Sequence, residues 1–425
     1  MTSTFNTISI IGLGYIGLPT AAMLASRKIR VIGVDINQYA VDTINKGQIH
    51  IVEPELDMIV SSAVSQGYIR ATTKPESADA FLIAVPTPFM GDHEPDIRFV
   101  EAAARSIAPV LKKGDLVILE STSPVGTTEQ MASWLAQARP DLSFPQQKQE
   151  HADINIAYCP ERVLPGKVVH ELVSNDRVIG GMTERCSQRA IALYKAFVEG
   201  ECITTNARTA EMCKLTENSF RDVNIAFANE LSIICEKLNI NVWELIKLAN
   251  RHPRVNVLQP GPGVGGHCIA VDPWFIVSKT PIEAKLIRAA REVNDGKPHW
   301  VLDKVKMAVA KHLQKNPDKK PKDVTIACFG LAFKPDIDDL RESPSLEIAI
   351  ELAKQFPESL LAVEPNICEL PDALPENIQL VTAEKAKDAS HIAVILVAHK
   401  AFRSLPASFW ASMAVVDTCG LTVTV

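Results

Sequence analysis

The sequence has no run of lysine or arginine residues, no CxxC pair and no long uninterrupted hydrophobic segment. Because 50 acidic residues outnumber 44 basic ones, it carries no electrostatic footprint of nucleic-acid binding. No apolar stretch reaches the roughly 18 residues of a membrane-spanning helix, which excludes a membrane span. The 425 residues, 47% hydrophobic and 22% charged, instead predict a soluble globular protein of roughly two to four domains.

Nine cysteines are scattered along the chain, and the closest pair is Cys202 and Cys213. Neither a zinc site nor a dithiol redox centre is expected without closely spaced cysteines, so we predict no metal. Free thiols are typical of a reducing compartment, which favours a cytoplasmic protein. The apolar segment Ile8–Ala25 is interrupted by glycines and has no basic region before it. It therefore predicts a buried strand and a helix rather than a secretion signal.

Short apolar runs alternate with helical patterns from Thr7 to about Ile203, which predicts a parallel sheet covered by helices. Residues 206–238 contain almost no helix breakers and predict one helix on the order of 45 Å long. A segment rich in proline and lysine, residues 314–323, reads as a linker, and alternation resumes after it. The predicted fold is α/β, with two Rossmann-like doubly wound parallel-sheet domains, residues 1–205 and 324–425, joined by a central helical domain, residues 206–313.

The segment Gly12-Leu-Gly14-Tyr15-Ile16-Gly17 directly follows the first predicted strand and opens the first helix. These glycines permit a tight turn, close approach of a pyrophosphate and close packing of helix on strand. Asp35 ends the second predicted strand, where a carboxylate can bond a ribose 2′-hydroxyl and would repel a 2′-phosphate. The pattern predicts NAD rather than NADP as the cofactor.

A glycine-rich segment, Gly261–Asp272, contains Cys268 beside His267 and four residues before an acid. Such a thiol could be an activated nucleophile, although composition alone favours an inert cysteine. On the long predicted helix, Lys214, Asn218 and Arg221 are spaced to project from one face. Asparagines are poor surface helix formers, so Asn218, Asn224 and Asn229 favour a face turned towards a site over a solvated stripe. Further polar motifs follow predicted strands, at Thr87, Thr122, Glu161–Arg162 and Lys334–Arg341.

Taken in order along nearly the whole chain, these motifs resemble those of the nucleotide-sugar 6-dehydrogenase family. The greatest similarity is to the bacterial branch that oxidises UDP-N-acetyl-D-mannosamine for surface polysaccharide synthesis, over Tyr158–Gly166, Arg251–Arg254 and Gly265–Trp274. The sibling branches differ at three of these positions, where this chain has Pro165 instead of glutamate, His267 instead of serine and Val271 instead of lysine.

The resemblance implies oxidation of a C6 primary alcohol to a carboxylate with two NAD in succession and no release of the aldehyde. Cys268 would hold the aldehyde as a thiohemiacetal, and the second oxidation would give a thioester for hydrolysis. Lys214 would stabilise alkoxide character or act as acid/base, with Asn218 assisting by hydrogen bonding. The remaining implied catalytic residues are Asp272, orienting water or Lys214, and Thr122 and Glu161, near the nicotinamide and the hydrolytic water.

The resemblance also implies a UDP-sugar substrate and a homodimer formed through the central helical domain. The cations available for the diphosphate are Arg162, Arg221 and Arg254, and His252 and Arg254 would reach a neighbouring subunit's site. Lys334 and Arg341 would close the cleft from the last domain, with Arg341 near the cofactor. The other implied substrate residues are Val163, Lys214, Asn218 and Gly265.

Three alternatives stay open at this point. The same chemistry could act on UDP-glucose, UDP-N-acetylglucosamine or GDP-mannose. A two-electron β-hydroxyacid dehydrogenase shares a Rossmann-plus-helix plan and a Lys/Asn pair, but it would leave Cys268 idle. A non-catalytic protein that binds NAD or a nucleotide sugar would have no use for the Lys214, Asn218 and Cys268 set.

Overall fold

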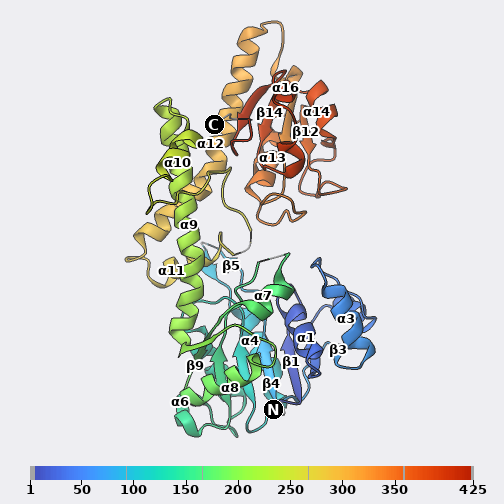
Figure 1. Ribbon diagram of the computed structural model, residues 1–425, viewed down its shortest axis with the longest axis vertical. Helices are drawn as coiled ribbons and strands as arrows, with labels where there is room; N and C mark the ends of the chain where they lie inside the picture. Colours follow the sequence, from blue (N-terminus) through green and yellow to red (C-terminus); the bar gives the residue numbers. More distant parts are fainter. Residues whose placement is uncertain (1–4, 92, 165, 267, 358, 423–425) are drawn as a thin grey trace. The chain divides into compact units, whose positions relative to one another are not determined.

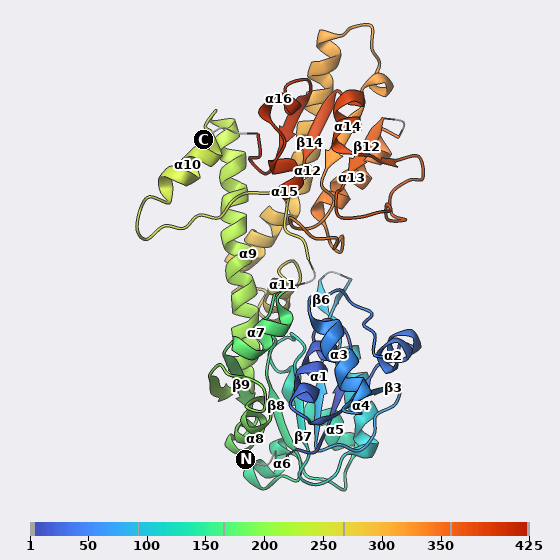
Figure 2. The ribbon, with the colours of Figure 1, turned by 45° about the vertical axis from the view of Figure 1, so that its right-hand side comes forward.

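The computed structural model describes residues 5–91, 93–164, 166–266, 268–357 and 359–422. They fall into two compact units, Met1–Glu217 and Asn218–Val425 (Figures 1 and 2). Each unit has its own sheet with its own hydrophobic layers.

The first unit contains an eight-stranded sheet in the order β10-β9-β8-β7-β4-β1-β2-β3. Neighbouring strands run parallel except for β8 and β9, which are antiparallel. A short antiparallel hairpin, β5 (Phe89–Met90) and β6 (Glu94–Pro95), follows β4. The sheet strands are β1 (Thr7–Ile11), β2 (Arg30–Val34), β3 (Ile69–Thr72), β4 (Ala80–Ile83), β7 (Leu116–Leu119), β8 (Asn155–Tyr158), β9 (Arg177–Gly181) and β10 (Cys202–Asn206).

Helices cover both faces of this sheet, because alternate strand residues point into two separate cores. Ile8, Ile10 and Leu82 pack with α1, α3, α7 and α8, whereas Phe81 and Ile83 pack with α4 and α5. Each such fully buried side chain stabilises the fold by roughly 1.5–3 kcal/mol. The helices are α1 (Gly17–Ser26), α2 (Gln38–Asn45), α3 (Leu56–Ser65), α4 (Arg98–Ile107), α5 (Thr127–Ala138), α6 (Pro145–Lys148), α7 (Val168–Ser174) and α8 (Glu184–Tyr194).

A 31-residue helix, α9 (Ala207–Lys237), begins in the first unit and continues in the second. Within the second unit it is joined to α12 by buried polar side chains. Arg291 of α12 forms an ion pair with Asp222 of α9 at 2.6 Å, and Asn229 donates to Asn294 at 2.9 Å. The other helices between α9 and the second sheet are α10 (Val242–Ala249), α11 (Asp272–Lys279) and α12 (Lys285–Lys315).

The second sheet is parallel throughout, in the order β13-β12-β11-β14-β15. Helices α12 and α13 cover one face, and α14, α15 and α16 cover the other. The strands are β11 (Ile326–Phe329), β12 (Leu360–Val363), β13 (Gln379–Leu380), β14 (Ile392–Ile395) and β15 (Ala414–Asp417); the helices are α13 (Pro344–Gln355), α14 (Ala383–Ala389), α15 (Lys400–Arg403) and α16 (Ala407–Trp410).

The predicted fold class is confirmed, with two Rossmann-like sheets and a helical segment between them. The structure differs from expectation in that β8 and β9 pair antiparallel, and elements such as β3, β10, β13 and α11 were not predicted. Apolar periodicity does not encode strand direction, and β3 is a short edge strand with alternating exposure. The division into three domains stays a prediction. Among the described residues, no helix is long and apolar enough to cross a membrane.

Candidate functional site

The glycine-rich turn after β1 has one glycine that faces open space and two that are enclosed. A Cβ on Gly12, which has a φ of +92°, would lie 2.5 Å from the Ala84 carbonyl oxygen, and one on Gly17 would lie 1.8 Å from the Gly12 oxygen. At Gly14 no atom lies within 4 Å of the position that a Cβ would occupy. The tight turn and the helix packing therefore explain the outer two glycines, and the open side of Gly14 leaves backbone accessible to a ligand.

Asp35 lies immediately after β2 and contacts the same turn. Its Oδ2 accepts a hydrogen bond from the Leu13 amide at 2.9 Å, and its Oδ1 accepts one from the Asn37 amide at 2.9 Å. Tyr15 and Ile16 lead into α1, where the Leu18 amide donates to the Gly14 carbonyl at 3.1 Å and the Thr20 amide donates to the Ile16 carbonyl at 3.1 Å. These residues fit a dinucleotide: the open side of Gly14 at the start of α1 suits a pyrophosphate, and Asp35 lies beside the turn.

The loops that follow β4 and β7 are bonded to each other. The Thr87 hydroxyl donates to the Thr122 carbonyl at 2.5 Å, so these two predicted residues are brought together. Glu211 of α9 accepts hydrogen bonds from the Gly126 amide at 2.6 Å and from the Thr128 amide at 2.8 Å. The first turns of α9, which lead to Lys214, are thereby fixed to the start of α5.

Glu161 is held on both of its carboxylate oxygens. Oε2 forms an ion pair with Arg177 of β9 at 2.6 Å, and Oε1 accepts the Arg162 amide at 2.7 Å. The guanidinium of Arg162 binds Glu217 at 2.8 Å, so this predicted substrate cation is already paired with a carboxylate. Val163 packs against the core on one face of the sheet.

A second buried carboxyl, Glu120, lies behind this pair at the end of β7. Its Oε1 accepts a hydrogen bond from the Tyr194 hydroxyl at 2.7 Å, and no described residue bonds its Oε2. Burial raises the pKa of Glu120 to about 7; the negative charge of Glu161 adds to this effect, whereas the Tyr194 hydrogen bond and the charge of Arg177 oppose it. Glu120 is therefore a largely neutral acid below neutral pH.

In the second unit, the segment carrying Cys268 is bonded to α9. The Asn218 amide donates to Asp272 Oδ2 at 2.5 Å, and both side chains are buried. The Asp272 backbone amide donates to the Cys268 carbonyl at 2.8 Å, where the turn passes into α11. Three predicted catalytic residues thus form one bonded group, and Lys214 lies one helical turn before Asn218 on α9.

The glycine-rich segment before Cys268 packs against the loop between β11 and α13. A Cβ on Gly265 would lie 2.5 Å from the Glu342 carbonyl oxygen and 2.7 Å from Pro344. That loop also carries Lys334 and Arg341, and the Arg341 guanidinium binds Asp339 at 2.6 Å. These three predicted substrate or cofactor residues therefore lie on adjoining loops.

The second sheet repeats the local geometry of the first. The Gly330 amide donates to the Val363 carbonyl at 2.8 Å, as Gly12 does to Val34. Glu364 follows β12 and accepts the Leu331 amide at 2.7 Å, the counterpart of Asp35. However, Glu364 also binds buried His399 at 3.0 Å, whereas the described part of the chain donates hydrogen bonds to the Asp35 carboxylate from backbone amides alone.

Three predicted cations remain on exposed surfaces. His252 and Arg254 lie on the exposed loop after α10, and Arg221 is exposed on α9. The structure describes no contact from any of the three to Cys268. His267 lies outside the described residues.

Three models of one family match the chain in order. They are the NAD binding, central and UDP binding domains of the UDP-glucose/GDP-mannose dehydrogenase family, matched over residues 6–198, 208–296 and 327–423. The chain belongs to this family. It is an NAD-dependent nucleotide-sugar dehydrogenase, which confirms the predicted cofactor and reaction class.

Its relatives match over their whole length. The chain is 68% identical to a UDP-N-acetyl-D-mannosamine dehydrogenase from Yersinia pestis, covering 98% of this chain and 99% of the relative. It is 64% identical to an NDP-N-acetyl-D-galactosaminuronic acid dehydrogenase from Ralstonia nicotianae, covering 98% and 96%. The solved UDP-D-ManNAc dehydrogenase from Pyrococcus horikoshii is 39% identical with a TM-score of 0.86, covering 98% and 96%.

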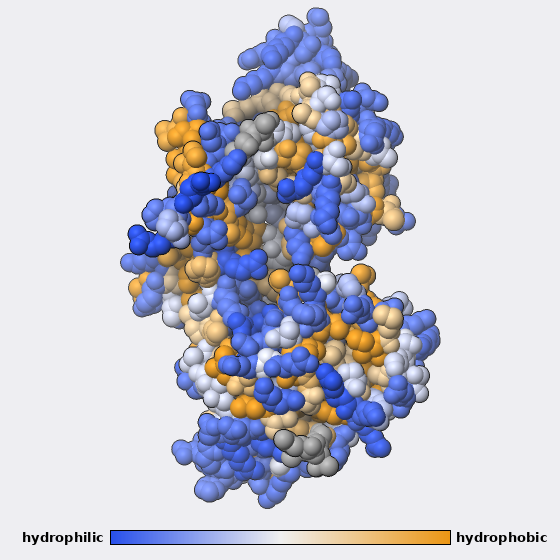
Figure 3. Space-filling view, viewed as in Figure 1, coloured by the Kyte–Doolittle hydropathy of each residue, from blue (hydrophilic) through white to orange (hydrophobic). Residues whose placement is uncertain are grey.

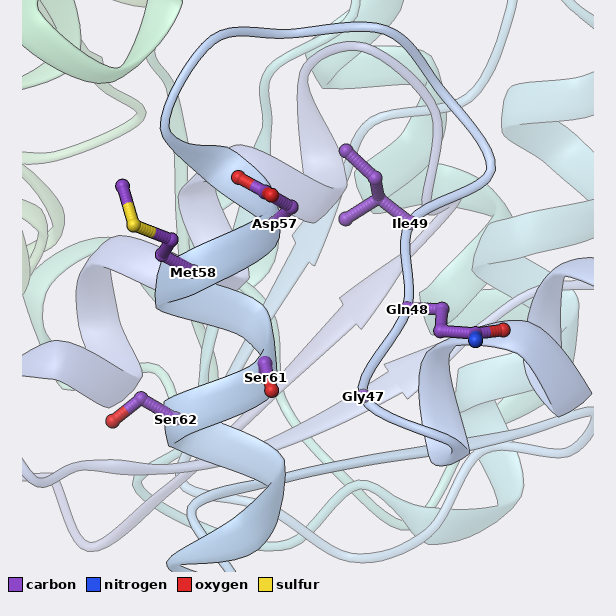
Figure 4. Close-up of a pocket in the computed structure, with 7 residues that line it drawn as sticks. All are labelled: Gly47, Gln48, Ile49, Asp57, Met58, Ser61 and Ser62. Atoms are coloured by element: carbon purple, nitrogen blue, oxygen red, sulfur yellow. The ribbon is translucent and has the colours of Figure 1, made fainter.

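Figure 4 shows a surface hollow in the first unit of this dehydrogenase, between the loop Gly47–Ile49 and α3. Its volume is about 720 Å³, and it opens to solvent. The lining contains none of the predicted site residues. Four residues that support the site were not predicted to do so, namely Arg177, Tyr194, Glu120 and Glu211. Glu120 and Glu211 lie at the starts of predicted motifs, whereas Arg177 and Tyr194 lie outside every motif.

The open side of Gly14 yields a test of cofactor binding in this family member. Gly14→Ala should leave the melting temperature unchanged, because its methyl group meets no protein atom, and should weaken NAD binding by roughly 10- to 100-fold. Gly17→Ala should instead lower the melting temperature. NAD titration and thermal unfolding of both variants check this. A Gly14→Ala variant that binds NAD normally would contradict the assignment.

The raised pKa of Glu120 should appear in the pH dependence of stability. An unfolded glutamate releases its proton near pH 4.5, whereas folded Glu120 keeps it until about pH 7. The free energy of unfolding should therefore fall by up to about 3 kcal/mol from this group as pH rises through that window. Glu120→Gln should remove this loss in urea unfolding at pH 5 and 8, and exposed Glu201→Gln should not. If the free energy of unfolding depended on pH equally in the wild type and in Glu120→Gln, the raised pKa of Glu120 would be contradicted.

Proposed function

We propose that this enzyme oxidises the C6 alcohol of UDP-N-acetyl-D-mannosamine to the carboxylate through a covalent intermediate on Cys268. The observation that carries the proposal is the bonded group Asn218–Asp272–Cys268 at the start of α11. A four-electron oxidation needs a group that retains the aldehyde, and a partly exposed thiol on a loop of glycines supplies one. The full-length similarity to enzymes named for this substrate supports the choice of sugar.

Each site residue has a separate proposed role. Lys214 stabilises negative charge on the reacting oxygen, and Asn218 holds Asp272, which orients water or the Lys214 ammonium. Gly12–Gly17 and Asp35 would hold NAD, which would supply the hydride acceptor for each oxidation. Thr122 lies near the nicotinamide, and Glu161 directs water to the thioester. Arg162, Arg221, Arg254, Lys334 and Arg341 provide cations for the nucleotide, with His252, Val163, Gly265 and Thr87 completing the binding surfaces.

Another nucleotide sugar is the second candidate for the substrate. The relative from Ralstonia nicotianae, which is 64% identical, is named for a galactosaminuronic acid. The glycine-rich loop with Cys268 speaks against a two-electron β-hydroxyacid dehydrogenase, because that chemistry would leave the thiol unused.

We further propose that the enzyme is a cytoplasmic homodimer that associates through α9. Phe220, Phe227 and Ile234 recur every seven residues on this helix, and between 43% and 68% of each side chain is exposed. Residues seven apart lie close to one face of a helix, so these three form an apolar stripe. Figure 3 shows further hydrophobic side chains gathered over α10, where Leu248 is 63% exposed. In a twofold-symmetric dimer, the apolar stripe of one subunit packs against the same stripe of the other subunit.

Counting NADH tests the proposed reaction. With a panel of UDP- and GDP-sugars, UDP-N-acetyl-D-mannosamine should give the highest kcat/KM and two NADH per sugar consumed. Cys268→Ala should form almost no carboxylate, because the aldehyde is no longer held. Cys368→Ala, an exposed cysteine elsewhere, is the matched control and should retain activity. One NADH per sugar, or carboxylate formation at the normal rate without Cys268, would overturn the mechanism.

The apolar stripe yields a test of assembly. Phe227→Glu should convert the dimer to a monomer at micromolar concentration, because a charge would be buried in the interface without a partner. Met58→Glu, at a somewhat more exposed position on α3, should leave the dimer intact. Light scattering after size-exclusion chromatography measures the mass. A dimeric Phe227→Glu variant, or a monomeric wild type, would rule out this interface.

A further inference from the structure

We propose that Arg177 is a positioning residue that fixes the Glu161 carboxylate for hydrolysis of the enzyme-bound thioester. This proposal rests on the proposed function, in which Glu161 directs water to the acylated Cys268. Arg177 lies on β9 and does not itself touch substrate; it acts only through Glu161.

Arg177 is buried, and its guanidinium forms an ion pair with the Glu161 carboxylate. The guanidinium is 2% exposed, and its NH1 lies 2.6 Å from Glu161 Oε2. NH2 donates to the Leu172 carbonyl at 3.2 Å, and no described residue accepts from the Nε–H. Two separate contacts therefore set the orientation of the guanidinium, and a lysine could not reproduce both.

The Glu161 carboxylate, like the Arg177 guanidinium, is held by two contacts. Oε1 of Glu161 accepts the Arg162 amide at 2.7 Å while Oε2 holds Arg177, so the plane of the carboxylate is set by one backbone and one side-chain contact. A buried ion pair contributes little net stability compared with well-packed apolar side chains. Its presence here is explained by orientation, because directing one water molecule requires an acceptor oxygen in a defined position.

Tyr194 and Glu120 lie beside the Arg177–Glu161 ion pair in the same buried cluster. The Arg177 guanidinium lies 5.4 Å from the centre of the Tyr194 ring, and Tyr194 donates to Glu120. Glu120 is the other carboxyl in this buried cluster. While it is protonated, Glu161 is the only anionic side chain paired with Arg177 among the residues that the structure describes. The cluster thus supplies one cation for one carboxylate.

Hydrolysis of the thioester on Cys268 consumes one water molecule. The oxygen of a water molecule bonds to the thioester carbon, and the C–S bond breaks. Cys268 leaves with the electron pair and recovers a proton, and the product is a carboxylate with release of one further proton. No oxidant or reductant takes part, so a defect confined to this step must leave both oxidations intact.

Trapping the covalent intermediate tests the role of Arg177. Arg177→Lys should release two NADH per active site in a rapid burst and then turn over at least tenfold more slowly, with KM little changed. Acid-quenched protein should carry an adduct on Cys268 with the mass of the nucleotide sugar less four hydrogens. Glu161→Gln should accumulate the same adduct. A slow Arg177→Lys variant without the burst and the adduct, or one with normal kcat, would overturn the proposal.

The controls separate this outcome from general damage. Arg291→Lys alters another buried arginine–carboxylate pair, with Asp222, and should accumulate no adduct whatever its stability. Adding Cys268→Ala to Arg177→Lys should abolish the adduct. If wild type gives one NADH per sugar, the proposed function fails; if wild type gives two and Arg177→Lys traps nothing, only the role of Arg177 fails.

Discussion

A buried polar side chain must find a hydrogen-bond partner, and on α9 this requirement determines where the functional loops lie. Glu211 binds the amides at the start of α5, which follow the loop of Thr122. Further along the helix, in the second unit, Asn218 binds Asp272, and Asn229 accepts the Gly261 amide at 2.9 Å. Each of these bonds has a large sequence separation, so within each unit α9 fixes segments that local structure could not place. Leaving any of these groups unpaired would cost roughly 1–3 kcal/mol.

The two sheets show how one local geometry serves two purposes. In both, a glycine with φ above +90° follows the first strand, and a carboxylate after the second strand accepts the next amide. In the first unit Asp35 makes no contact with a cationic side chain among the described residues, so it can face a ribose. In the second unit His399 binds Glu364, and its Nδ1 accepts the Asp336 amide at 2.9 Å. The same carboxylate position there holds the loop that carries Lys334.

Much of the fold and part of the site could be predicted, because those features depend on short sequence spacings. The run from Gly12 to Gly17 encodes its own turn, and the four-residue spacing of Lys214 and Asn218 encodes a shared helix face. The antiparallel β8–β9 pair and the bond from Tyr194 to Glu120 depend instead on contacts between distant elements. Arg177 reads in the sequence as an ordinary charged residue at the start of a strand. Only its burial against Glu161 reveals that it supports the site.

Burial separates Cys268 from the cysteines of the core. It raises the pKa of Cys159 and Cys328 to about 12, so these thiols stay protonated and inert at neutral pH. Cys268 is only partly buried, and it follows a run of glycines that pack closely on Phe333, Glu342 and Pro344. A nucleophile that forms and releases an acyl group needs access to substrate and to water, which a core position excludes. The glycines before Cys268 serve close packing instead, because a Cβ on Gly263 or Gly265 would lie within 3 Å of Pro344.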